Sequence, residues 1–143
     1  MTSIEVRVLR AGEEAILDRV AADVFDDPIL PGPAREFLSD SRHHLAVAIA
    51  DATVVGFASA VHYVHPDKIH PELWINEVGV APTHQGRGIG KALMNALLEV
   101  ARELGCAEAW VLTERDNKPA MHLYQSIGGK EAEDETVMFT FYL

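Results

Sequence analysis

The residues with the clearest chemical potential lie in a glycine-rich turn, Gln85-Gly86-Arg87-Gly88-Ile89-Gly90. Three glycines at alternate positions leave a backbone without side chains, so that several N–H groups can face one point. The turn precedes a segment with a strong helical pattern, and a helix N-terminus adds partial positive charge. This combination predicts a site for a phosphate or pyrophosphate group.

The placement of charge around the turn supports a bound anion. Arg87 and Lys91 stand at the positive end of the expected helix, where acidic side chains are usually preferred. No Asp or Glu occurs between Glu77 and Glu99, although 22 of the 143 residues are acidic. An anion bound at the turn explains both observations.

Two well-known phosphate motifs do not fit this turn. A Walker A loop needs glycine where the chain has Gln85, and Ser or Thr where it has Ala92. A dinucleotide-binding G-x-G-x-x-G motif that starts at Gly86 needs glycine where the chain has Lys91. The turn by itself therefore indicates an anion at a helix start and no particular ligand.

The other reactive side chains give weaker signals. Cys106 follows the end of the same expected helix, where the negative helix end raises a thiol pKa, so we interpret it as a packing residue. His62, His65 and His70 suggest a metal, but residues 62 and 65 of a strand face opposite sides and no ligand set is completed. We expect no metal, and His62 or Tyr63 could instead line a substrate cleft.

Composition indicates one compact domain over residues 1–143, with 48% apolar and 24% charged residues. The formal charge of -10 argues against nucleic-acid binding and is compatible with a cationic partner. We find no apolar run long enough for a membrane span and no signal-peptide pattern. Because Cys106 is the only cysteine, no internal disulfide can form, and a cytoplasmic setting is expected.

Hydrophobic periodicity predicts the elements that position these residues. Strands are expected over residues 4–10, 45–50, 53–65, 73–80, 108–113 and 137–142, with a tight hairpin at Asp51-Ala52. Helices are expected over residues 12–25, 34–39 and 88–104, and a further helix is capped by Asn117 and ends at Gly128-Gly129. This order predicts an α/β (α+β) fold with a mixed, mostly antiparallel sheet, about four flanking helices and a right-handed crossover between strands 73–80 and 108–113.

The pattern Q-x-x-G-x-G of residues 85–90 resembles the signature of the GNAT superfamily of N-acetyltransferases. The strand Trp74–Val80 followed by Ala81-Pro82 is similar to the central strand of that family. The segment Asn117–Tyr124 followed by Gly128-Gly129 resembles its Asn…Ala-x-x-Leu-Tyr…Gly segment. The match runs from residue 73 to 129 and implies the GNAT fold, whose central strands splay apart to admit acetyl-CoA.

The resemblance also implies roles for single residues. Main-chain groups of Val78 and Val80 would meet the acetyl carbonyl and the pantetheine arm, and N–H groups of residues 85–91 would hold the pyrophosphate. The full set implied for acetyl-CoA is Val78, Gly79, Val80, Gln85, Gly86, Arg87, Gly88, Ile89, Gly90, Lys91, Asn117, Ala120 and Tyr124. Direct attack by a neutral amine needs a base and an acid. Glu77, the carboxylate of an apolar strand, is the expected base, acting directly or through a water, and Tyr124 is the expected acid.

Membership of this family does not fix the acceptor. The chain is acidic overall, and a cluster of acidic residues precedes residue 137, namely Glu131, Glu133, Asp134 and Glu135. Both features favour a cationic small-molecule amine as the acceptor. The segments 63–66, 76–78 and 134–139 are similar to short-type aminoglycoside 3-N-acetyltransferases, which are antibiotic-resistance enzymes. That resemblance implies transfer to an aminoglycoside 3-amino group and gives Tyr63, Glu77, Asp134 and Glu135 as substrate-binding residues.

Two departures from the aminoglycoside pattern leave alternatives open. Glu77 replaces the more usual Asp, and the expected N-terminal helices are shorter. Acetylation of a polyamine, or of a protein or peptide amine, is an alternative, as is a non-catalytic module that binds acetyl-CoA. A homodimer is compatible with the family resemblance, although no sequence feature demands one.

Overall fold

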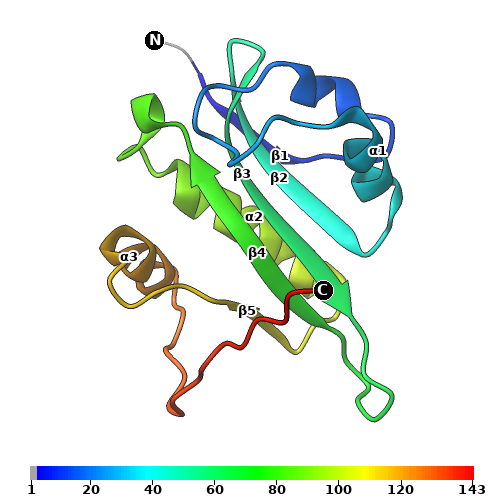
Figure 1. Ribbon diagram of the computed structural model, residues 1–143, viewed down its shortest axis with the longest axis vertical. Coiled ribbons are helices and arrows are strands. Elements are labelled where there is room, and N and C mark those ends of the chain that lie inside the picture. The colour runs from blue at the N-terminus through cyan, green and yellow to red at the C-terminus, as the bar shows by residue number, and fades with distance from the viewer. Residues whose placement is uncertain (1–2) are drawn as a thin grey trace. The chain divides into compact units, whose positions relative to one another are not determined.

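The computed structural model describes residues 3–143 (Figure 1). Its elements, in chain order, are β1 (Glu5–Val8), the 3-10 turn η1 (Glu14–Asp18), α1 (Pro31–Ser39), β2 (His43–Ala50), β3 (Thr53–Tyr63), β4 (Glu72–Val80), the 3-10 turn η2 (Pro82–His84), α2 (Ile89–Glu103), β5 (Glu108–Val111) and α3 (Lys118–Ser126). The described residues form two compact units, 3–112 and 113–143. Within the described part, no helix is both long and apolar enough to cross a membrane.

One sheet with strand order β1-β2-β3-β4-β5 organises the first unit. All neighbours are antiparallel except β4 and β5, which run parallel across the α2 crossover. The predicted mixed, mostly antiparallel sheet is therefore confirmed. The β2–β3 connection is the expected tight hairpin, because Asp51 and Ala52 both adopt positive φ, 50° and 61°.

Helix α2 covers one face of the sheet and forms the main core with it (Figure 1). A methyl group added at Gly56 of β3 would lie 3.1 Å from the Cγ2 atom of Ile89 and 3.2 Å from the Cδ1 atom of Leu93. Leu93 and Leu97 are fully buried. The apolar stripe of α2 thus faces β3 directly, as its helical spacing predicts.

The segment after η1 crosses the opposite face of the sheet. A Cβ atom at Gly79 of β4 would lie 2.3 Å from the carbonyl oxygen of Val24 and 2.8 Å from the ring of Phe57. Phe25 stacks on Phe57 with 3.8 Å between ring centroids. Only glycine at position 79 permits this close approach of the loop to β4.

The prediction of a helix over residues 12–25 is wrong. Only η1 is helical there, and Asp23 adopts a positive φ of 62°. The reason is tertiary: Ala21 donates to the carbonyl of Val54 at 2.9 Å, and the N–H of Val54 donates to Arg19 at 2.8 Å. Backbone groups that a helix would have used internally are paired with β3, so residues 3–143 hold three α-helices rather than about four.

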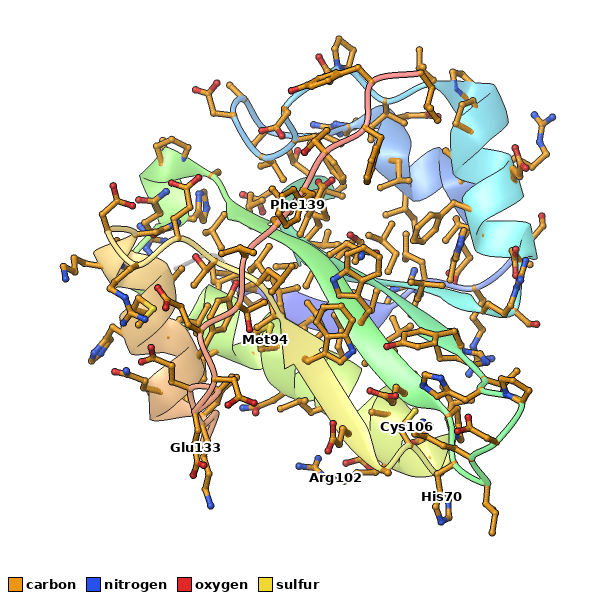
Figure 2. The ribbon with its side chains drawn as sticks, turned by 60° about the horizontal axis from the view of Figure 1, so that its bottom comes forward. His70, Met94, Arg102, Cys106, Glu133 and Phe139 are labelled. Atoms are coloured by element: carbon orange, nitrogen blue, oxygen red, sulfur yellow. The ribbon has the colours of Figure 1, made fainter. Side chains whose placement is uncertain are left out.

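The predicted last strand over residues 137–142 is also wrong. The segment is extended and forms no ladder with any described strand (Figure 2, where Phe139 lies on it). Its large apolar side chains are exposed, namely Val137, Met138, Phe139, Phe141, Tyr142 and Leu143. The pattern gives the segment strand propensity, but a strand also needs a partner for its backbone, and the described residues supply none.

The remaining elements agree with the sequence predictions apart from their ends. α1 begins at Pro31 rather than near residue 34, and β5 ends at Val111 rather than 113. Gly105, with φ of 75°, follows the end of α2 as expected. The side chain of Asn117 caps α3 by accepting the Ala120 N–H at 3.2 Å.

Candidate cofactor and acceptor site

A bulge in β4 sets the direction of Glu77. Glu77 pairs with Ser59 and Ile75 pairs with Ala60, so Asn76 is an extra residue in β4. In a regular strand, positions 74 and 77 would face opposite sides of the sheet. Because of the extra residue, Glu77 and Trp74 lie on the same face of the sheet, the face opposite α2.

Beyond the bulge, β4 has an open edge. Its parallel pairing with β5 ends at Ile75 and Val111, whereas β4 continues to Val80. No strand of residues 3–143 pairs with β4 on this side after Ile75. The expected separation of the two central strands is therefore present.

The main chain of Val78 and Val80 points toward that open edge. Ala81, the next residue along, donates its N–H to the carbonyl of Val55 at 2.8 Å. Backbone groups alternate in direction along an extended chain, so those of residues 80 and 78 turn away from β3. These are the N–H and C=O groups that the sequence predicts to meet the acetyl and pantetheine parts of acetyl-CoA.

The glycine turn lies between β4 and α2 with its backbone uncovered. Gly86 and Gly88 adopt positive φ, 77° and 76°, and a Cβ added at either would meet nothing within 4 Å. Gly88 is the N-cap of α2, so the N–H groups of the first turn have no acceptor within the helix. Gln85 ties the turn to β4, because its Nε2 donates to the carbonyl of Val80 at 3.1 Å.

Positive charge at this helix start is uncompensated. Arg87 and Lys91 are exposed, and neither has an ion pair within residues 3–143. The first turn of α2 contains no acidic residue. Ile89 is buried and anchors the turn, while Gly90 beside it is half-buried. The turn combines free N–H groups with two free cations, as an anion site requires.

Glu77 is exposed on the outer face of β4 and makes no hydrogen bond or ion pair in the part of the chain that the structure describes. Two residues further along β4 is Gly79, and the carbonyl of Val24 packs against its backbone on the same face of the strand. A carboxylate without a partner on an uncovered strand can accept a proton or hold a cation.

Sequence reasoning missed an acidic loop on this same face. Asp23, Asp26 and Asp27 line a hollow of about 250 Å³ together with Phe25, whose ring stacks on Phe57 of β3. Position 57 pairs with Gly79, two residues from Glu77. The run Asp26-Asp27-Pro28 was the available signal, but the expected helix over residues 12–25 concealed its position.

Sequence reasoning also missed an aromatic cluster. Trp74 of β4 and Trp110 of β5 stand side by side in the parallel register and stack, with ring centroids 5.1 Å apart. The Trp110 Nε1–H donates to the Tyr63 hydroxyl at 2.8 Å. Tyr63, predicted as a substrate residue, thus lies on the same face as Glu77, because it pairs with Glu72 two positions before Trp74.

The second unit holds the remaining predicted residues. Tyr124 lies on α3 and is half-buried, and burial raises the pKa of its phenol, so it keeps its proton at neutral pH. Asn117 and Ala120 form the cap of the same helix. Asp134 and Glu135 are exposed in the segment after α3 and follow Glu133 in the chain, which Figure 2 labels.

The described residues contain no group of three or more His, Cys, Asp and Glu side chains suited to a metal. His44 and His62 share a hydrogen bond of 2.8 Å, and His65 bonds to Glu72. Burial, and to a lesser degree the charge of Glu72, raises the pKa of Cys106, which lies between α2 and β5 (Figure 2). A thiol held protonated in this way is a poor nucleophile.

The sheet opens after Ile75 next to a glycine turn at the start of α2, which is the arrangement that the resemblance to N-acetyltransferases predicts. The model of the Acetyltransferase (GNAT) family matches residues 14–128, and the chain belongs to this family.

Curated relatives carry several acetyltransferase activities. The streptothricin acetyltransferase of Streptomyces lavendulae is 40% identical over 90 residues, 63% of this chain and 45% of that protein. The N-alpha-acetyltransferase RimI of Mycobacterium tuberculosis is 32% identical over 105 residues, 73% of this chain and 63% of that protein. The chain thus spans between 45% and 63% of the length of these two relatives.

Solved structures of the same fold include two aminoglycoside acetyltransferases. HMB0005, from an uncultured soil metagenomic sample, superposes with a TM-score of 0.82 and 23% identity over 99% of both chains. AAC(6')-Iy in complex with CoA superposes with a TM-score of 0.74 and 22% identity over 99% of this chain and 96% of that one. At these identities the likeness establishes the fold.

Proposed function

We propose that this chain transfers an acetyl group from acetyl-CoA to a primary amine of a cationic small molecule. The observation that carries the proposal is the unpartnered carboxylate of Glu77 on β4, directly before the main chain of Val78, which faces the open strand edge. The proposed proton acceptor, Glu77, and the proposed contact of the acetyl group, Val78, are adjacent in the chain, and direct transfer to an amine requires the two to be close together.

The proposed donor site consists of the open edge and the glycine turn. Val78 and Val80 offer main-chain groups to the acetyl and pantetheine parts, with Gly79 between them. The turn from Gln85 to Lys91 offers the free N–H groups of α2 and two cations to the pyrophosphate. Asn117, Ala120 and Tyr124 complete the proposed set by resemblance to the family, and their place at the donor site is part of the proposal.

Three residues of the chain, Glu77, Val78 and Tyr124, are proposed to transfer protons and to stabilise charge during the reaction. When bound, acetyl-CoA supplies a thioester as the activated acyl group. Glu77 takes the proton of the acceptor's ammonium group, directly or through a water, and so frees the nitrogen lone pair. The N–H of Val78 would donate a hydrogen bond to the acyl oxygen of a cofactor bound at the open edge. The phenol of Tyr124, which carries its proton at neutral pH, would supply that proton to the sulfur as the carbon–sulfur bond breaks and the carbon–nitrogen bond forms.

For the acceptor we propose an aminoglycoside, at its 3-amino group. Support comes from the free Glu77 carboxylate, the formal charge of -10 and the segments 63–66, 76–78 and 134–139 that are similar to aminoglycoside 3-N-acetyltransferases. Asp134 and Glu135 are proposed to meet further amino groups of such a substrate.

Streptothricin is the second candidate acceptor. It is favoured by the 40% identity to a streptothricin acetyltransferase over 90 residues. Protein or peptide amines and polyamines are further alternatives, the first favoured by the likeness to RimI.

The test is the release of free thiol from acetyl-CoA with sisomicin, streptothricin, spermidine and a short peptide as acceptors. We expect turnover with sisomicin well above the hydrolysis of acetyl-CoA alone, and mass spectrometry of the product identifies the acetylated nitrogen. If only streptothricin is acetylated, the second candidate replaces the first. Binding of acetyl-CoA without turnover of any amine would mean a non-catalytic module.

A further inference from the structure

An aromatic cluster formed by Tyr63, Trp74 and Trp110 lies on the face of β3, β4 and β5 that is opposite α2, within the first unit. The two indoles are nearly parallel, at 9° with 5.1 Å between centroids. Trp110 is fixed by its hydrogen bond to Tyr63, and the ring of Tyr63 meets His65 edge-on at 5.3 Å. Trp110 and Tyr63 are half-buried, so they form a rigid support for the ring of Trp74.

Trp74 itself is 38% exposed, which sets it apart from the other aromatic residues of the sheet. Phe57, two positions further along the same face of β3 from Ser59, is covered by the stacked ring of Phe25 and is only 3% exposed. Trp74 has one partner at its side, and part of its surface is open to solvent. An indole that is held in place and still exposed is suited to stacking on a ligand.

The bulge at Asn76 brings Trp74 and Glu77 to the same face of β4. Their pairing partners on β3 are Val61 and Ser59, two residues apart. Two residues of a strand span about 7 Å, so the indole and the carboxylate stand about that far apart along the sheet. Without the extra residue, the two side chains would lie on opposite faces.

These two groups attract the same kind of ligand. An indole face attracts an ammonium group placed within about 6 Å of its centroid, and tryptophan does so best among the aromatic residues. Glu77 is an unpaired negative charge on the same face. The second carboxylate near the cluster, Glu72, bonds to His65 and is only 20% exposed, so it adds little free charge.

We propose that Trp74, supported by Trp110 and Tyr63, binds a second cationic group of the acceptor while Glu77 receives the amine that becomes acetylated. This inference rests on the proposed function and narrows the substrate class. The acceptor carries at least two cationic groups roughly 7 to 10 Å apart, given the spacing of the two side chains along the strand. Simple monoamines bind weakly, because they reach only one of the two groups.

Intrinsic fluorescence provides a direct binding test, because Trp74 and Trp110 are the only two tryptophans in the chain. The full-length protein is titrated, without acetyl-CoA, with sisomicin, spermidine and n-butylamine. We expect a saturable change of tryptophan emission with the two polycations and none with n-butylamine at the same concentrations. The absence of a change with both polycations, or an equal change with n-butylamine, would overturn the proposal.

Kinetics of variants provide the second test. Trp74→Ala is expected to raise KM for sisomicin by about three- to thirty-fold with kcat nearly unchanged, the range that a lost cation–π contact gives. Trp74→Phe keeps an aromatic face and should recover most of the affinity. Ile69→Ala, which changes a 94% exposed apolar side chain outside the cluster, should match the unaltered protein.

The outcomes separate this inference from the proposed function. If the unaltered protein acetylates sisomicin and both Trp74 variants keep its KM, the function stands and the role of Trp74 is wrong. If no amine is acetylated, the proposed function fails, while the fluorescence titration still decides whether the cluster binds polycations. If circular dichroism shows that Trp74→Ala is misfolded, the titration of the unaltered protein decides, and the absence of an emission change with both sisomicin and spermidine overturns the proposal.

Discussion

At the scale of single residues, Glu77 combines two properties that rarely occur together on a core strand. Its carboxylate is exposed without a partner in residues 3–143, yet it stands between the buried Ile75 and the close contact at Gly79. An exposed carboxylate without a partner adds little to stability, and this one is well placed for proton transfer.

Glu77→Gln is expected to lower kcat by about 100- to 10,000-fold, because it removes a general base while keeping the shape of the side chain. Acetyl-CoA affinity should change less than twofold, since none of the proposed donor contacts uses the side chain of Glu77. Steady-state kinetics and calorimetric titration with acetyl-CoA measure the two quantities. Glu99→Gln on the exposed side of α2 is the matched control. Equal losses of turnover and cofactor affinity would remove Glu77 from the role of base.

From the sequence, Glu77 is predicted as a site residue because it is the one carboxylate of an apolar segment, and Tyr63 by resemblance; both roles stay predictions. The sequence could not select Trp74. Whether position 74 shares a face with position 77 depends on the bulge at Asn76, and the bulge depends on the register with β3. Alternation within a single strand predicts the opposite arrangement.

At the scale of elements, the contact between β4 and the loop after η1 positions both sides of the proposed acceptor site. Gly79 allows the Val24 carbonyl to approach β4, and the stacked rings of Phe25 and Phe57 hold the loop beside it. Backbone packed this closely has little room to adjust.

Gly79→Ala is expected to destabilise the protein by about 1 to 3 kcal/mol, because the new methyl group would overlap a backbone carbonyl that cannot move aside alone. Urea unfolding followed by tryptophan fluorescence measures the free energy of unfolding. Gly32→Ala is the control, since an added Cβ there meets nothing within 4 Å and Gly32 lies in α1. A Gly79→Ala protein as stable as the control would mean that the loop is free to shift from β4.

The glycine turn makes a separate prediction about the cofactor. Lys91→Gln is expected to weaken acetyl-CoA binding by roughly three- to tenfold, because an exposed cation beside a phosphate contributes modestly and is screened by salt. The loss should shrink as ionic strength rises. Lys68→Gln, in the loop that precedes β4 and so at the opposite end of this strand from the glycine turn, should leave affinity unchanged. Equal affinity of the Lys91 variant at low salt would place the pyrophosphate elsewhere.

Element types were predictable where local pattern and tertiary demand agree. α2 has an uninterrupted apolar stripe and a glycine at each end, and both signals survive in the structure. The segment 12–25 also has an apolar stripe at helical spacing. However, the N–H of Ala21 and the carbonyl of Arg19 form hydrogen bonds with Val54 of β3, and no local sequence pattern predicts this contact. Residues 137–142 have strand propensity without a described partner. Both errors arise from pairing between segments distant in sequence.

At the scale of the whole molecule, the buried side chains of the described residues all lie between Leu9 and Ala101. Residues 113–143 thus contribute no fully buried side chain of their own. The sequence-based expectation of one domain over residues 1–143 stays a prediction. A fragment of residues 1–112 that unfolds cooperatively in urea would count against it, and one that does not fold would support it.

Acid stability is a property of the whole first unit, and His44 controls part of it. Burial, followed by the charges of His62 and His43, lowers the pKa of His44 to about 4. The folded state therefore keeps His44 neutral and hydrogen-bonded to His62, whereas the unfolded chain takes up a proton below its ordinary value of 6.5. This stabilisation is fully present above pH 6.5 and is lost as the pH falls toward 4.

We expect the free energy of unfolding to fall by on the order of 1 kcal/mol more between pH 7 and pH 5 in the unaltered protein than in His44→Gln, a value reduced from the full shift because His44 is only half-buried. Urea unfolding at several pH values measures both slopes. His122→Gln, an exposed residue of α3, should follow the unaltered protein. Parallel pH profiles of the unaltered protein and His44→Gln would show that His44 is protonated equally in the folded and unfolded states, and that the acidic side chains alone set the acid limit.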